Sequence, residues 1–155
     1  MMVLYPQTEL AQEQIGSALA RACTGAGLIF LKGDLGAGKT TLARGFLRGV
    51  GYTGAVKSPT YTLIEPYEIN DKNYYHLDLY RLADPDELEF LGLRDLLNEQ
   101  AVLLVEWPEQ GGDALPLPDL LITIIYKEGG RELSIDAQTS GGERMLESLK
   151  DELGR

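Results

Sequence analysis

The segment LIFLKGDLGAGKTTLARGFL, residues 28–47, decides which fold the rest of the chain can adopt. It begins with a short apolar run that is typical of a strand buried on both faces. It continues with the phosphate-binding loop pattern G-x-x-x-x-G-K-[ST], at Gly33, Gly38, Lys39 and Thr40. Apolar residues then recur at helical spacing. The order of strand, loop and helix favours a P-loop over a glycine-rich turn that binds nothing.

Each part of this loop has a chemical task. Glycines allow positive φ angles and a close approach of the backbone to a ligand. Backbone N–H groups turned inward form a concave anion site, and the start of the helix adds its unpaired N–H groups and the positive end of its dipole. Lys39 supplies a charge for the β- and γ-phosphates, and Thr40 offers a hydroxyl to Mg²⁺.

A second continuous apolar run, AVLLVEW at residues 101–107, predicts another buried strand. In P-loop proteins an apolar strand that ends in an acid lies beside the P-loop strand, and the acid reaches the Mg²⁺ shell. Glu106 fits that role, with a strand-terminal surface acid as the alternative.

The remaining periodicities and turn residues predict one compact domain over residues 1–155. We expect an α/β P-loop NTPase domain with a central mixed, partly parallel sheet flanked by helices. The predicted helices are Thr8–Cys23, the P-loop helix to about Val50, one opened by Asp84 and Pro85, and Glu143–Leu153. The predicted hairpins pair Thr62–Ile69 with Asn73–Tyr80 and Leu120–Tyr126 with Arg131–Ala137, and residues 108–118 are expected to be a loop.

Two further stretches carry polar groups whose role the residues alone leave open. Residues 58–62, SPTYT, follow the P-loop helix, where many P-loop proteins carry a loop that senses the γ-phosphate; a strand-initiating turn is the alternative. His76 and Asp78 share one face of a predicted strand. Composition favours a solvated edge for that face over a functional one.

Composition limits the function further. The formal net charge is −10, with only 14 Lys and Arg residues, so direct binding of nucleic acid is not expected and a partner would hold it. No apolar run reaches the ~18 residues of a membrane span, and no signal peptide is evident. A lone cysteine, Cys23, excludes an internal disulfide, and we expect a cytoplasmic protein without membrane contact.

Four strings together resemble the TsaE (formerly YjeE) family, small P-loop ATPases of tRNA threonylcarbamoyladenosine biosynthesis. They are GDLGAGKTT at Gly33–Thr41, SPTYTL at Ser58–Leu63, HLDLYRLADPDELE at His76–Glu89 and VEWPE at Val105–Glu109. Their order is far more specific than a P-loop alone. The last ~15 residues carry no motif, so nothing is carried over to them.

The resemblance implies a role for each matching position. ATP and Mg²⁺ are the implied cofactors, with Asp78, Lys39 and Glu106 as catalytic residues. Thr40 and Glu106 would hold the metal, and residues 58–62 would form a switch loop. Asp78 matches a carboxylate that the family needs for activity, which argues against a solvated edge. Trp107 matches another functional position of the family, although a tryptophan there could equally serve to pack the core. The implied nucleotide-binding residues are Asp34, Leu35, Gly36, Ala37, Gly38, Lys39, Thr40, Thr41 and, more weakly, Arg131.

The implied function is ATP hydrolysis in support of TsaB- and TsaD-like proteins, which modify the adenosine next to the anticodon of tRNA. The tRNA would be reached only through that complex. Whether Asp78 or Glu106 orients the attacking water stays open. A nucleotide-dependent binding switch with incidental hydrolysis is the alternative. A small-molecule kinase is less favoured. The arginines of this chain at positions 44, 48, 81 and 94 are dispersed, and no arginine-rich helical lid is evident.

Overall fold

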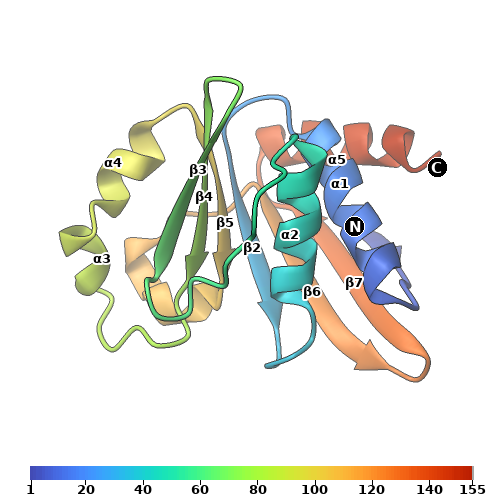
Figure 1. The fold of residues 1–155 in the computed structure, drawn as a ribbon, viewed down its shortest axis with the longest axis horizontal. Coiled ribbons are helices and arrows are strands. Elements are labelled where there is room, and N and C mark those ends of the chain that lie inside the picture. The colour runs from blue at the N-terminus through green and yellow to red at the C-terminus, as the bar shows by residue number, and fades with distance from the viewer. Residues whose placement is uncertain (155) are drawn as a thin grey trace.

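A computed structural model of the chain describes residues 1–154. Its centre is one sheet of seven strands, shown in Figure 1, in the order β1-β7-β6-β2-β5-β4-β3. The strands are β1 (Met2–Leu4), β2 (Gly27–Gly33), β3 (Ile64–Ile69), β4 (Lys72–Asp78), β5 (Ala101–Glu106), β6 (Leu120–Lys127) and β7 (Gly130–Ala137). The helices are α1 (Glu9–Ala22), α2 (Lys39–Gly49), α3 (Glu87–Phe90), α4 (Leu93–Asn98), the 3₁₀ segment η1 (Pro108–Ala114) and α5 (Ser140–Glu152).

The sheet is mixed, as the sequence predicts. Strands β6, β2, β5 and β4 are parallel neighbours at its centre, and antiparallel pairs lie toward both edges. The carboxyl ends of parallel strands meet at one edge of a sheet. The pairing of β2 with β5 confirms that they are neighbours, and the glycine-rich loop follows β2 at the same end of the sheet where β5 ends in Glu106.

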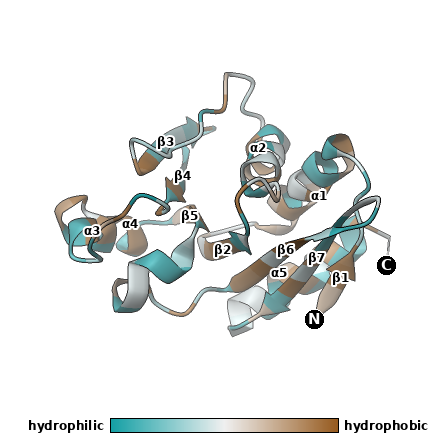
Figure 2. Ribbon diagram, turned by 90° about the horizontal axis from the view of Figure 1, so that it is seen from below, coloured by the Kyte–Doolittle hydropathy of each residue, from teal (hydrophilic) through white to brown (hydrophobic). Residues whose placement is uncertain are grey.

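Both faces of the central strands are buried, which explains their continuous apolar runs. Ile29 and Leu104 belong to a core cluster with residues of α1, α2 and α5. Leu28 and Leu103, one residue away on the same strands, belong to a second cluster with residues of α3 and α4. Hydrophobic colouring accordingly follows β6 beneath the helices in Figure 2. No helix among residues 1–154 is long and apolar enough to cross a membrane.

Glycines bring α1 unusually close to α2. A Cβ at Gly16 would collide with the backbone oxygen of Leu42, and one at Gly45 would collide with the backbone oxygen of Glu13. Only a residue without a side chain fits such a contact. The close packing fixes α1 against the P-loop helix, and the N-terminal half of α1 thereby lies next to the loop itself.

Several local predictions need correction. The helix expected from Asp84 begins at Glu87, because residues 84–86 form a turn in which the Asp84 carboxylate accepts the Asp86 N–H at 3.0 Å. The expected loop at residues 108–118 contains the 3₁₀ segment η1. The last helix begins three residues earlier than expected, at Ser140, because the hydroxyl of Thr139 caps it. Strand β1 was not predicted at all.

Candidate functional site

The loop between β2 and α2 presents backbone donors at the start of a helix. Gly36 and Gly38 have φ angles of 80° and 107°, a region that glycine enters without strain. The N–H of Leu42 donates to the Gly38 oxygen at 3.0 Å and forms the first hydrogen bond of α2. The N–H groups of the first turn, at residues 39–41, therefore lack a helical partner, as an anion site requires.

Lys39 brings a buried positive charge to the same place. Its side chain is buried, and Nζ donates to the backbone oxygens of Gly33 at 2.6 Å and Asp34 at 3.0 Å. Nζ also lies 4.3 Å from the ring centroid of Trp107. Burial lowers the pKa of Lys39 below its usual range, while the carboxylates of Glu106 and Asp78 act in the opposite direction.

Glu106 and Asp78 lie side by side because they are register partners on the parallel strands β5 and β4. Both are buried, so the expectation of a solvated edge for the His76–Asp78 face is wrong. The Thr40 hydroxyl donates to Oε2 of Glu106 at 2.9 Å, and Nε2 of His76 lies 2.6 Å from the same oxygen. A carboxylate accepts hydrogen bonds when ionised, so His76 donates from Nε2. The fully buried His76 thus fixes Glu106 from within the core.

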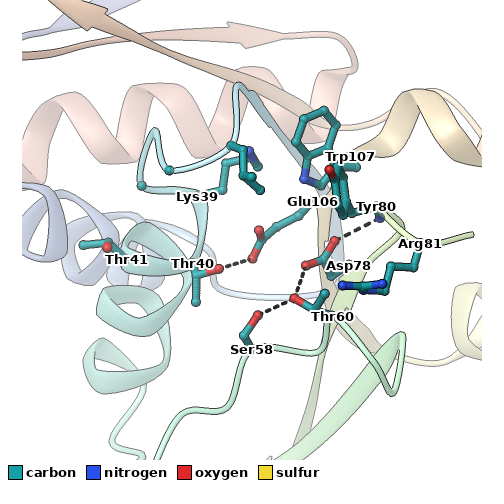
Figure 3. Close-up of a pocket in the computed structure, with 13 residues that line it drawn as sticks. Lys39, Thr40, Thr41, Ser58, Thr60, Asp78, Tyr80, Arg81, Glu106 and Trp107 are labelled. Atoms are coloured by element: carbon teal, nitrogen blue, oxygen red, sulfur yellow. Dashed lines mark hydrogen bonds between the residues drawn. The ribbon is translucent and has the colours of Figure 1, made fainter.

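Asp78 connects the site to the segment at residues 58–62. Its Oδ2 accepts the Thr60 hydroxyl at 3.0 Å and its Oδ1 accepts the Tyr80 N–H at 3.0 Å. The hydroxyls of Ser58 and Thr60 lie 2.8 Å apart. Figure 3 shows this chain of hydroxyls leading to Asp78 beside Glu106. Both carboxylate oxygens of Asp78 are therefore held in place at the pocket wall.

These groups surround a pocket of about 370 Å³. It is lined by Leu35, Gly36, Gly38, Lys39, Thr40, Thr41, Ser58, Thr60, Asp78, Tyr80, Arg81, Glu106 and Trp107. Tyr80 and Arg81 were not predicted as site residues, although they lie two and three residues after Asp78, the last residue of β4. Tyr80 packs against Trp107 with ring centroids 5.0 Å apart, and Arg81 lies over Tyr61.

Three predicted nucleotide-binding residues do not line this pocket. Asp34 is exposed at the edge of the loop, and Ala37 is buried beneath it. Arg131 lines a neighbouring cavity of about 230 Å³ together with Gln12 and Thr41. Its Nε donates to the Ala37 oxygen at 3.1 Å. Gln12, on α1, also reaches the loop, and no pattern in the sequence marked it.

The oxygen donors present suit Mg²⁺, a hard cation that is bound through one or two carboxylates together with phosphate and water oxygens. Thr40 and Glu106 supply a hydroxyl and a carboxylate at hydrogen-bonding distance from one another. Within residues 1–154, no cluster of three or more His, Cys, Asp or Glu side chains is placed to hold a metal ion. One hydroxyl and one carboxylate leave most of the octahedral shell of Mg²⁺ to other oxygens, such as those of water or a phosphate.

Fold and site together define the class: a mixed α/β protein with a glycine-rich strand–loop–helix and a polar pocket at the carboxyl ends of its parallel strands. Comparison with known proteins is more specific. The sequence profile of the family described as threonylcarbamoyl adenosine biosynthesis protein TsaE matches residues 6–133. The chain belongs to the TsaE family, which confirms the resemblance.

Individual relatives agree. The tRNA threonylcarbamoyladenosine biosynthesis protein TsaE of Haemophilus influenzae is 51% identical over 124 residues, 80% of this chain and 78% of that protein. The protein of the same name from Bacillus subtilis is 43% identical over 128 residues, 83% of this chain and 78% of that protein. The crystal structure of Bacillus subtilis YdiB superposes with a TM-score of 0.83 at 31% identity, covering 97% of this chain and 94% of that one.

Proposed function

We propose that this chain is a Mg²⁺-dependent ATPase that supports TsaB- and TsaD-like proteins in the threonylcarbamoyladenosine modification of tRNA. The observation that carries the proposal is the hydrogen bond between Thr40 and Glu106, beside the unpaired N–H groups of residues 39–41. A hydroxyl and a carboxylate that meet at a helix N-terminus match the needs of a metal-bound triphosphate. Membership of the TsaE family supports the pathway.

Three side chains of the pocket would have different roles in binding the Mg²⁺–ATP complex. Lys39 would leave the oxygens of Gly33 and Asp34 to contact the β- and γ-phosphates. Thr40 and Glu106 would hold Mg²⁺, which supplies charge neutralisation on the phosphate oxygens when bound. Catalysis of this kind consists mainly of positioning and electrostatic stabilisation, which a buried and hydrogen-bonded set of groups provides.

Asp78 is the better candidate for orienting the attacking water. Glu106 already accepts hydrogen bonds from Thr40 and His76, an arrangement that suits a metal ligand. The Asp78 carboxylate is hydrogen-bonded to Thr60 and the Tyr80 N–H, and within residues 1–154 it has no hydrogen bond to the phosphate loop. We therefore assign the water to Asp78 and the cation to Glu106.

The nucleoside would leave the phosphate site past Thr41 into the neighbouring cavity of about 230 Å³. Gly36, Gly38 and Thr41 line both cavities, so the two are adjacent. The net charge of −10 fits a division of labour in which tRNA rests on the partner proteins.

One observation favours the second candidate, a nucleotide-dependent binding switch. The hydrogen bond from Thr60 to Asp78 joins the exposed segment around Ser58 and Tyr61 to the pocket wall. A ligand that moves Asp78 would therefore move this surface, and a partner could sense the change without fast hydrolysis.

Steady-state ATP hydrolysis, measured for the chain alone and with TsaB- and TsaD-like partners, tests the proposal, with Lys39→Ala as the inactive control. If the chain by itself hydrolyses ATP slowly and the rate rises when the partners are added, the result supports an ATPase whose catalytic site is completed in the complex. No rise, with ATP still required for complex formation, favours the switch. Vigorous phosphate transfer to a small metabolite would refute both and favour a kinase.

A further inference from the structure

Side chains from distant parts of the chain hold the phosphate loop by its carbonyl groups. The Gly38 oxygen accepts Nε2 of Gln12 at 2.7 Å. The Ala37 oxygen accepts Nε of Arg131 at 3.1 Å. The Leu35 oxygen accepts the hydroxyl of Tyr126 at 3.3 Å. Gln12 comes from α1, and Tyr126 and Arg131 come from the β6–β7 hairpin, whose tip lies at the same end of the molecule as the loop (Figure 1).

The geometry of the peptide bond relates the direction of each held carbonyl group to the direction of the next backbone N–H in the loop. In a trans peptide the C=O of one residue and the N–H of the next point to opposite sides of the chain. No cis peptide occurs among residues 1–154. Holding the oxygens of Leu35 and Ala37 on one side of the chain therefore turns the N–H groups of Gly36 and Gly38 to the other side, where the phosphates are expected. Gln12 also lies 3.5 Å from the Ala37 oxygen, and it shares the Gly38 oxygen with the Leu42 N–H of α2.

We propose that Gln12, Tyr126 and Arg131 are positioning residues, an outer clamp that preorganises the phosphate-binding amides before a ligand arrives. The inference rests on the proposed function, because it concerns the same phosphate site. A loop with three glycines has many accessible conformations, and ordering it upon binding would weaken affinity. The clamp supplies that order in advance.

The clamp residues are themselves held firmly. Gln12 is buried, and its helix packs against α2 through the glycine contacts at residues 16 and 45. Arg131 donates to the Gly130 oxygen at 3.0 Å, and its guanidinium lies 4.2 Å from the ring centroid of Tyr126. Arg131 therefore cannot move away from the loop without breaking these two contacts, and burial restricts the Gln12 side chain.

The rival explanation is that Gln12 and Arg131 act only through contact with the nucleoside, because they also line the cavity of about 230 Å³ that the proposed function gives to it. The two ideas differ in which ligands they affect. A clamp on the loop weakens the binding of any polyphosphate. A nucleoside contact weakens ATP and leaves a ligand without a nucleoside unchanged.

The test compares Mg²⁺-ATP with Mg²⁺-tripolyphosphate, each titrated calorimetrically into wild type, Gln12→Ala, Arg131→Ala and Tyr126→Phe. Lys127→Ala is the matched control, because this exposed residue of the same hairpin forms an ion pair with Glu132, at 3.9 Å, and does not contact the loop by any hydrogen bond within residues 1–154. We expect Gln12→Ala and Arg131→Ala each to bind both ligands about tenfold more weakly. Tyr126→Phe should weaken both by a smaller factor, and the control should match wild type.

Hydrogen exchange of the ligand-free protein gives a second readout that needs no ligand. The amides of Ala37 and Leu42 donate to the oxygens of Asp34 and Gly38 at 3.0 Å. They should exchange at least tenfold faster in Gln12→Ala and Arg131→Ala, while the amides of the central strands stay protected, which also shows that the variants fold. A loss confined to ATP, or unchanged exchange at these amides, overturns the clamp. If wild type binds neither polyphosphate, the proposed function fails, and the exchange data alone decide whether the side chains order the loop.

Discussion

Replacement of Asp78 by Asn separates the chemistry of this carboxylate from its structural role. The Asn side chain has the same shape, so its oxygen can still accept the Tyr80 N–H, now 3.0 Å from Asp78 Oδ1. Its amide nitrogen meets the Thr60 hydroxyl, which can rotate to accept a hydrogen bond at the present 3.0 Å. The negative charge is lost, and with it the ability to polarise a water molecule.

The expected magnitudes follow from these contacts. Exchanging charge-assisted hydrogen bonds for neutral ones at a buried site should cost about 1–2 kcal/mol of stability. For a domain of this size that corresponds to a fall in Tm of roughly 3–6 °C. A positioned general base contributes about 10²–10⁴ in rate, so kcat should fall by at least about 100-fold. Affinity for ATP should stay within about threefold, because within residues 1–154 the Asp78 carboxylate is hydrogen-bonded to Thr60 and Tyr80 and not to Lys39 or Thr40.

The assay is ATP turnover in the presence of partners, combined with calorimetric ATP binding and a thermal melt of each protein. Asp78→Ala serves as the comparison: it should lose turnover to a similar degree but melt lower, because both hydrogen bonds disappear. An Asp78→Asn protein that keeps kcat within threefold of wild type would refute the water-positioning role. A 100-fold loss of ATP affinity with unchanged kcat would show instead that Asp78 belongs to ligand binding.

Three further outcomes are expected. His76→Phe removes the 2.6 Å contact between His76 and Glu106, which holds the Glu106 carboxylate in place. The Mg²⁺ concentration for half-maximal nucleotide binding, measured by fluorescence of a labelled ATP, should therefore rise about 10–100-fold. An unchanged Mg²⁺ concentration would contradict the idea that His76 positions Glu106. Gly45→Ala forces a methyl group into the backbone of α1 and should destabilise the fold by about 1–3 kcal/mol in urea unfolding, whereas equal stability would mean that the helices can separate at little cost. Burial, with a smaller contribution from Asp119, raises the pKa of Cys23 from 9.0 to about 12, so the folded protein should resist alkylation at pH 8.5 until it is unfolded. Because the native state then keeps its proton longer than the unfolded state, this thiol should make stability fall as pH rises from about 9 to 12.

Local signals in the sequence were sufficient for the phosphate loop and for most of the elements around it. Apolar runs, turn residues and the loop pattern predicted β2, α2, both hairpins and the strand that ends in Glu106, because each depends on residues close together in the chain. The acid at the end of β5 could be placed beside the loop because parallel strands end at a common edge. The role of Asp78 came from family resemblance, since composition alone pointed to a solvated edge.

Only the tertiary structure decided how the loop and its acids are held. His76 meets Glu106 across two strands, and Gln12 and Arg131 reach the loop from α1 and β7, 26 residues before Gly38 and 94 residues after Ala37. No periodicity encodes such contacts, because they depend on strand order, on the glycine-mediated approach of α1 to α2 and on the reach of the β6–β7 hairpin. The sequence by itself determined which groups could bind a phosphate, and the packing of distant elements determined the direction in which those groups point.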